Sequence, residues 1–311
     1  MYEPQKYWLQ KLRRLHPNVS LAKGPGAARF APHKPLLLLA LIDLADAAGP
    51  AGLASHVPLN ADLRVRFLGS WAVVVRRWGS KPNLNLPFYH LSSQGFWVPK
   101  QANGLTATDP DSTAAIELHP EFVALLALPG FREVARHVLI QTWFPADEQI
   151  GLYALYGAMP DPGAIPGGVE EDSTSYAASA GRDARFRIQV VTQYIYTCAL
   201  TGYTLTTAGG ATIVEAAHIA DFASTRNNDP RNGLALTPDA HWSFDELLWT
   251  VDEKQHVIVA EASFSDWSPE GRSLTQFRNR PLHFNFRAQL RPHDDYLALH
   301  REEFRTRWNP K

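Results

Sequence analysis

The stretch TIVEAAHIADFASTRNNDPRNGLALTPDAHWSFDELL, from Thr212 to Leu248, decides the fold of the C-terminal part of this chain. An apolar segment, Ala211 to Ile219, predicts a strand, and the run GLAL after the polar loop predicts a second one. A helix is predicted to begin after Thr237 and to reach about Leu247, because Thr is a good N-cap residue and Pro238 suits a first helical turn. Two strands and a helix are therefore expected here.

Polar residues occupy regular places in this predicted unit. His218 lies at the end of the first strand, Asn232 follows 14 residues later, and His241 follows nine residues after that. Asp245 comes four residues beyond His241, so both side chains lie on one face of the predicted helix. A histidine and a carboxylate placed in this way suit the binding of a divalent cation.

The spacing of His218, Asn232 and His241 resembles that of the HNH nuclease family. The local words CxxTG (Cys198 to Gly202), EAAHI, RNGLAL and H-x-x-F-D resemble the family as well. The resemblance covers roughly residues 182–311, including the tail DDYLALHREEF. It implies a ββα-metal centre of two strands and a helix around one metal ion, which hydrolyses DNA phosphodiester bonds.

The resemblance also implies a role for each residue. His218 would be the general base that takes a proton from the attacking water, a task that suits a neutral imidazole near pH 7. Asn232 would hold the loop and orient the histidine. His241 would bind one divalent metal ion, Mg²⁺, Mn²⁺ or similar, with Asp245 as the second ligand.

The sequence departs from the family pattern at two places. Many members carry a metal-binding Asp or His immediately before the catalytic His, whereas Ala217 stands there in this chain. Glu215, on the same strand face, could replace that ligand, or it could be a surface or packing residue. Many members also carry a zinc knuckle built from two CxxC pairs. Here Cys198 is the one cysteine and Thr201 stands where a second is expected, so no structural zinc is predicted and Cys198 is expected to be a buried small residue.

Charge is distributed unevenly along the chain. Residues 1–100 hold 13 Lys and Arg against 4 Asp and Glu, whereas residues 101–311 hold 17 against 27. This asymmetry favours polyanion binding near the N-terminus, although a solvated surface with a chance imbalance would give the same counts.

The words PHKPLLLLALIDL and LPFYHL, ahead of a GFW strand, resemble the sulfur-binding domains of McrA-like, type IV restriction endonucleases. This resemblance covers about residues 1–155 and implies recognition of phosphorothioate DNA, in which sulfur replaces a non-bridging phosphate oxygen. A shallow apolar cup rimmed by cations would favour the sulfur. The candidate contacts, assigned by proximity to these words, are Arg29, His33, Lys34 and, in a hairpin predicted over Asn83 to Pro99, Pro87, Phe88, Tyr89 and His90. The alternatives are that Phe88 belongs to the core and that His33 and Lys34 simply begin a helix.

The predicted fold class is α+β. A mostly helical DNA-reading domain with a small β-sheet (residues 1–156) is followed by a linker rich in Gly, Pro, Ser and acidic residues (157–181) and by the nuclease domain flanked by helices (182–311). The longest apolar run, Leu36 to Leu44, is too short to cross a bilayer, and the N-terminus lacks the layout of a signal peptide. We expect a cytoplasmic protein with no membrane partner.

The sequence thus predicts a modification-dependent restriction endonuclease that acts on double-stranded DNA. A homodimer is expected, because cutting both strands requires two active sites or two visits. Two other interpretations stay open: an HNH endonuclease that reads a methylated or otherwise altered base, and a non-catalytic DNA-binding regulator with a decayed nuclease fold.

Overall fold

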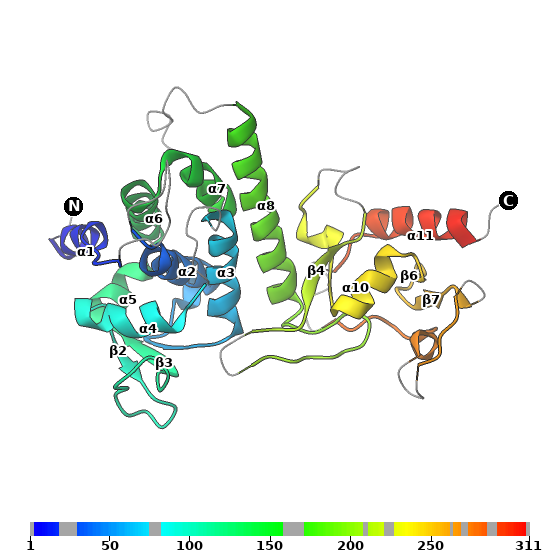
Figure 1. Ribbon diagram of the computed structural model, residues 1–311, viewed down its shortest axis with the longest axis horizontal. Coiled ribbons are helices and arrows are strands. Elements are labelled where there is room, and N and C mark those ends of the chain that lie inside the picture. Colours follow the sequence, from blue (N-terminus) through cyan, green and yellow to red (C-terminus); the bar gives the residue numbers. More distant parts are fainter. Residues whose placement is uncertain are drawn as a thin grey trace. The chain divides into compact units, whose positions relative to one another are not determined.

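The computed structural model describes residues 3–18, 30–74, 82–157, 171–207, 211–220, 227–261, 264–268, 273–284 and 291–308. The chain divides into two compact units, whose helices and strands are drawn in Figure 1. The first unit ends at Arg185 and the second begins at Phe186, apart from Ala211, which groups with the first. Helices and small sheets make up both units, so the predicted α+β class is confirmed. None of the helices among these residues is long and apolar enough to cross a membrane.

The first unit is mostly helical, as predicted. Its elements are α1 (Glu3–Arg13), α2 (His33–Ala47), η1 (Gly49–Ala51), β1 (His56–Pro58), α3 (Ala61–Val74), α4 (Asn85–His90), η3 (Leu91–Gln94), β2 (Trp97–Lys100), β3 (Ala115–Leu118), α5 (Pro120–Leu126), α6 (Pro129–Trp143), α7 (Ala146–Tyr156) and the start of α8 (Glu171–Gln193). The three strands form one antiparallel sheet in the order β1-β3-β2, which is the small sheet expected from the sequence.

Helix α2 lies at the centre of this unit. Its own buried apolar residues occupy all sides of the helix, and it packs against α3, α4 and α6. Trp8 of α1 is fully buried and stacks on Phe122 of α5, with ring centroids 4.8 Å apart. Cation–carboxylate pairs join the helices around α2. Asp46 accepts hydrogen bonds from Arg132 and Arg136, which lie one turn apart on α6.

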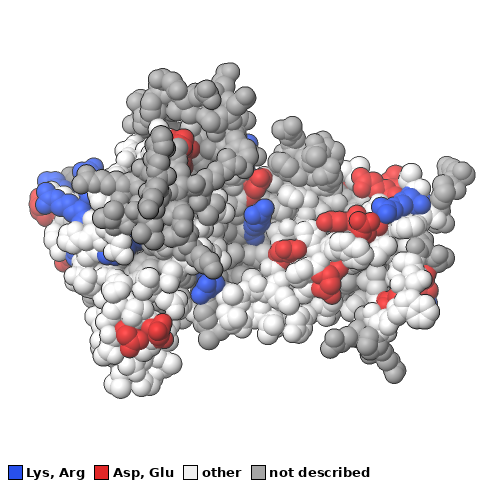
Figure 2. All heavy atoms as spheres, in the orientation of Figure 1, with Lys and Arg blue, Asp and Glu red and all other residues white. Residues whose placement is uncertain are grey.

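A second ion pair joins α2 to α3. Asp43 lies 3.0 Å from Arg66 Nε, and the Arg66 side chain is only 7% exposed. Burial raises the pKa of Asp43 above its ordinary value, against the opposing effect of Arg66. Part of the N-terminal basic excess is thus placed inside the unit, where it cannot contact DNA. Figure 2 shows charged groups of both signs at the surface over α1 and over α11.

Two sequence predictions about this part of the chain are wrong. The predicted hairpin over Asn83 to Pro99 is instead α4, η3 and β2, because Leu84, Phe88 and Leu91 have helical spacing and are all buried. Pro87 is tolerated there, since it lies in the first turn of α4, where its missing N–H would have no helical partner.

The predicted linker is also wrong in part, because residues 171–181 belong to α8. Gly181 lies inside this helix, although glycine often ends helices. A Cβ at this position would collide with the carbonyl oxygen of Gly151 in α7, so the glycine allows α8 and α7 to pack closely. The rest of the predicted linker, from 158 to 170, lies outside the described residues.

The second unit holds the end of α8 and the smaller elements that follow. These are β4 (Glu215–His218), η4 (Pro230–Asn232), β5 (Gly233–Leu236), α10 (Pro238–Asp245), β6 (Trp249–Val251), β7 (Val257–Val259), η6 (Leu274–Phe277) and α11 (Asp294–Trp308). Strands β4 and β5 pair antiparallel, as do β6 and β7. Helix α10 packs against β4, β5 and β6, and α11 packs against β6.

Candidate active site

Two strands and a helix form the site, in the order predicted. The register of β4 and β5 places His218 opposite Gly233 and Ala217 opposite Leu234. Every residue of β5 is buried, which fixes the hairpin in the unit, whereas Glu215 at the start of β4 is exposed. Thr237 stands at the N-cap position of α10, with Pro238 following as predicted.

Asn232 holds the loop between the two strands. The residue is fully buried, and its Oδ1 accepts a hydrogen bond from the Ala220 backbone N–H at 2.9 Å. Its Nδ2 donates to the carbonyl oxygens of Ala220 and Asn227, at 3.1 and 3.3 Å. These bonds tie together the two described ends of the loop, on either side of residues 221–226.

The expectation that Asn232 orients the histidine is wrong, because the Asn232 side chain bonds Ala220 and Asn227, and Asn228 is the amide that contacts His218. Its Oδ1 lies 3.1 Å from His218 Nε2. Because an amide oxygen can only accept, Nε2 carries the proton and Nδ1 presents the lone pair of the neutral ring. The sequence reasoning missed Asn228, since the run Asn227-Asn228-Asp229 indicates a turn and nothing more specific.

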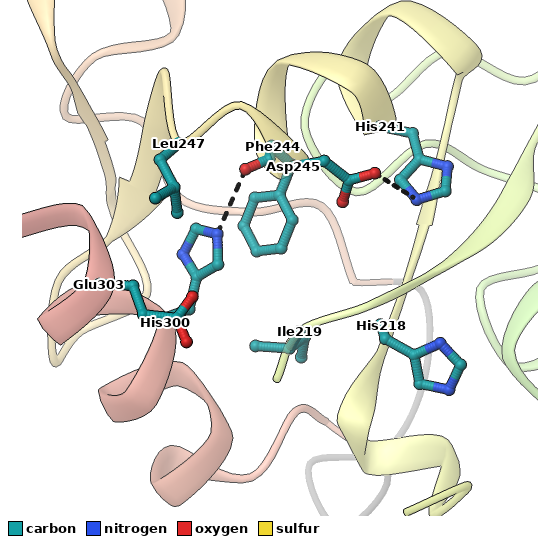
Figure 3. A pocket seen from close by; sticks show the side chains of 8 residues that line it. All are labelled: His218, Ile219, His241, Phe244, Asp245, Leu247, His300 and Glu303. Atoms are coloured by element: carbon teal, nitrogen blue, oxygen red, sulfur yellow. Dashed lines mark hydrogen bonds and ion pairs between the residues drawn. The ribbon is translucent and has the colours of Figure 1, made fainter. Parts of the chain in front are cut away.

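His241 lies between two carboxylates. Its Nδ1 is 2.7 Å from Glu215 Oε1, and its Nε2 is 3.4 Å from Asp245 Oδ2. Figure 3 shows His241 and Asp245 projecting from α10, with a dashed line marking the approach of Asp245 to His241. The Asp245 side chain is 60% exposed and that of Glu215 is 52% exposed, so both carboxylates remain accessible from solvent.

The donor atoms around His241 fit a divalent cation. A proton held on Nδ1 by the close Glu215 carboxylate leaves the Nε2 lone pair directed toward Asp245, and imidazole nitrogen with carboxylate oxygen is a common ligand pair for such ions. Among the described residues, no three His, Cys, Asp or Glu side chains gather closely enough to hold a metal ion. An ion bound here would therefore complete its coordination with water or phosphate oxygens.

His218, His241 and Asp245 line one cavity of about 350 Å³. Its lining includes His218 from β4, His241 and Asp245 from α10, and His300 and Glu303 from α11 (Figure 3). The sequence reasoning did not identify the two α11 residues, although the tail DDYLALHREEF contains both.

His300 is a neutral structural histidine. Burial lowers the pKa of His300 to about 4, and its ring stacks on Phe244 with centroids 3.7 Å apart. Its Nδ1 lies 2.9 Å from Thr250 Oγ1, and its Nε2 lies 3.3 Å from the Phe244 carbonyl oxygen. His300 thus supports the end of α10 beside Asp245.

The candidate sulfur-binding residues have mixed surroundings in the first unit. Phe88 is fully buried, and its carbonyl oxygen accepts a hydrogen bond from Trp97, so the prediction that it contacts DNA is wrong for the folded chain. Pro87 is buried as well. Tyr89 donates its hydroxyl hydrogen to the Thr108 carbonyl oxygen at 2.7 Å, and His90 is exposed.

The remaining candidates lie at the start of α2. His33 packs its ring against Trp71, with centroids 4.6 Å apart. Lys34 donates to the His16 carbonyl oxygen at 2.6 Å, while the His16 backbone N–H donates to Gln94 in η3, the element that follows α4. His16 therefore links Lys34 to the segment after His90. Arg29 lies outside the described residues.

The model of a family described as HNH endonuclease matches residues 198–252. Among solved structures, the chain is similar to a modification-dependent TagI restriction endonuclease, with 18% sequence identity and a TM-score of 0.31 over 39% of this chain and 37% of that one. The similarity thus spans little more than a third of that chain. No curated protein sequence matches. Residues 198–252, which contain β4, β5 and α10, are an HNH endonuclease domain.

Proposed function

We propose that this protein is a modification-dependent, type IV restriction endonuclease. Its second unit hydrolyses phosphodiester bonds of double-stranded DNA, and its first unit recognises phosphorothioate-modified DNA. The observation that carries the nuclease assignment is the shared cavity, because the candidate base His218 and the candidate metal ligands His241 and Asp245 all line it.

The chain's own residues account for the proton transfer. A water oxygen forms the new bond to phosphorus while Nδ1 of His218 accepts a proton from that water. The bond from phosphorus to the 3′ oxygen breaks, and the departing oxygen takes a proton from solvent. The products are a 5′-phosphate and a 3′-hydroxyl.

A single divalent metal ion is general among HNH nucleases, and His241 and Asp245 would hold it here. When bound, the ion neutralises charge on the scissile phosphate and on the departing oxygen. Glu215 would support the site without touching the metal: its carboxylate orients His241 by accepting a hydrogen bond from Nδ1–H, with 2.7 Å between the nitrogen and Oε1.

The phosphorothioate part of the proposal rests on sequence words of the first unit. Lys34 and His33 begin α2, and His16 connects Lys34 to the segment that follows Tyr89 and His90. Lysine side chains commonly contact phosphate oxygens, and Lys34 is only partly buried.

Nicking of supercoiled plasmid tests the nuclease assignment. The wild-type chain should nick plasmid that carries phosphorothioate linkages when Mg²⁺ or Mn²⁺ is supplied. Nicking should stop when EDTA is added. His218→Ala should lose about 10²–10⁴-fold in rate, the usual contribution of a positioned general base. Metal-independent nicking, or equal rates in the two proteins, would reject this assignment.

A gel shift with the full-length His218→Ala chain tests the reader. Three duplexes are compared that differ only at one linkage: plain, Sp phosphorothioate and Rp phosphorothioate. Preference for one sulfur diastereomer supports a stereospecific sulfur site. Equal binding to all three, with preference for a duplex carrying a methylated base, would favour the alternative of a modified-base reader.

A further inference from the structure

Two side chains outside the predicted catalytic set enclose the imidazole of His218. Phe186 of α8 stacks on it with ring centroids 3.9 Å apart and an angle of 4° between the planes. Asn228 lies 3.1 Å from its Nε2. We propose that Phe186 and Asn228 are positioning residues that together fix the ring plane and the tautomer of the general base. The proposal rests on the nuclease function proposed above.

The strand register explains why Phe186 can reach the ring. His218 pairs with Gly233 across the hairpin, and a Cβ at position 233 would lie only 2.9 Å from Phe186 Cζ and would also collide with Val190. The glycine in the word RNGLAL therefore leaves the space in which the Phe186 ring sits. Phe186 is 2% exposed, so the stack is a packed contact and not a surface encounter.

The two contacts restrict different degrees of freedom. A parallel ring at 3.9 Å opposes rotation of the imidazole about its Cβ–Cγ bond, because turning the ring would drive its edge into the Phe186 face. The Asn228 oxygen, as an acceptor, selects the Nε2–H form. With both in place, the Nδ1 lone pair points in one direction, as a base that must meet a bound water requires.

Phe186 also favours the charged product of the proton transfer. When His218 accepts the proton from water, the imidazolium that forms lies against the face of an aromatic ring, and such faces attract cations. The stack thus orients the neutral imidazole before the proton transfer and stabilises the imidazolium after it.

Cleavage by Phe186→Leu and by a matched variant, Val190→Ala, tests the proposal. Val190 is fully buried one turn later on the same helix and packs over the same glycine, so both variants lose packing, but only the first loses the ring on His218. We expect Phe186→Leu to lower the single-turnover rate about 10–100-fold. DNA affinity and the metal concentration for half-maximal rate should stay unchanged. Val190→Ala should cleave within a few-fold of wild type despite a comparable loss of thermal stability.

Nitrogen-15 NMR of histidine-labelled protein gives a second readout that needs no cleavage. The His218 signals are those missing from His218→Ala. The wild-type chain should show the Nε2–H tautomer. Asn228→Ala should show a mixture of tautomers, and so should Phe186→Leu, because an imidazole that can rotate leaves the Asn228 oxygen for part of the time.

The outcomes separate the two proposals. If the wild-type chain does not nick DNA with any divalent metal, the proposed function fails, and the NMR experiment still decides the positioning roles. If the wild-type chain nicks DNA while Phe186→Leu keeps both its rate and a pure Nε2–H tautomer, the positioning proposal is overturned.

Discussion

The two units place carboxylates beside nitrogen-bearing side chains in different ways. In the first unit, Asp46 receives hydrogen bonds from Arg132 and Arg136, whose side chains are each only 9% exposed. In the second unit, Glu215 and Asp245 lie beside His241, and His241 and Asp245 line an open cavity. An arginine always keeps its protons, so the first arrangement is complete without a ligand. A histidine can present a lone pair, so the second retains the capacity to bind an ion.

The largest effect is expected at the second arrangement. Asp245→Asn should slow DNA cleavage about 10²–10³-fold, as expected when a group that stabilises developing charge is lost. Single-turnover assays at fixed metal measure it. Glu215→Gln is the matched change: it should raise the metal concentration needed by about 10–100-fold and restore the rate once metal saturates. Equal behaviour of the two variants would mean that Glu215 is a ligand itself, in the place left by Ala217.

At the first arrangement the expected loss is in stability. Asp46→Ala leaves two guanidinium groups, each only 9% exposed, without the carboxylate that they share. This should lower the free energy of unfolding by about 2 kcal/mol, less than for a fully buried pair, because the Asp46 side chain is itself 39% exposed. Urea denaturation measures it. Asp62→Ala, which removes a half-exposed partner 3.5 Å from Arg66, should cost less than about 1 kcal/mol. Similar losses of unfolding free energy in Asp46→Ala and Asp62→Ala would contradict the expected difference between the two carboxylates.

Acid should change the stabilising contributions of His300 and Asp43, one buried group in each unit, with opposite sign. The pKa of His300 is lowered to about 4 in the folded chain, so its stabilising contribution is present above its ordinary pKa of 6.5 and is lost as pH falls toward 4. Relative to His300→Gln, the wild type should lose about 3 kcal/mol of unfolding free energy between pH 7 and pH 4. Parallel pH curves for the two proteins would reject this.

The raised pKa of Asp43 has the reverse consequence. Its contribution to the stability of the first unit is present below the ordinary aspartate value of 3.8 and is lost as pH rises through the raised pKa.

The smallest effect is expected at the surface of the first unit. Lys34→Ala should weaken DNA binding modestly and reduce the slope of log affinity against log salt by about 1, as loss of one phosphate contact does. Fluorescence anisotropy at several salt concentrations measures the slope. Lys6→Ala is the control, because Lys6 is exposed on α1 and paired with Glu3. Identical slopes for Lys34→Ala and the wild type would move the reader site elsewhere.

The sequence predicted the second unit well because its signals are local. Pro238 suits the first turn of α10, although Thr237 before it makes no capping hydrogen bond with its side chain, and the spacing from His218 to His241 follows from one hairpin and one loop. The secondary structure of the first unit was harder to predict from the sequence. The segment LNLPFYHL fits both an alternating strand pattern and a helix, and the burial of Leu84 and Phe88 by other helices decides for the helix.

Some site residues could not be predicted from local signals. Phe186 meets His218 from a helix 32 positions earlier in the chain, and Glu303 enters the cavity from a helix 85 positions later than His218. Such contacts depend on tertiary packing, which a short sequence motif does not specify. Asn228 is near in sequence, but its side chain direction follows from a loop that Asn232 holds.

Cys198, the one cysteine of the chain, has a practical consequence for single-molecule experiments. Its side chain is fully buried, and its Sγ lies 3.5 Å from the Thr237 backbone nitrogen at the start of α10. Thiol reagents require an accessible thiolate, so the folded chain presents them with no native target. A cysteine introduced at an exposed position would therefore be the single site of dye attachment, and DNA engagement could be followed by fluorescence without first replacing a native residue.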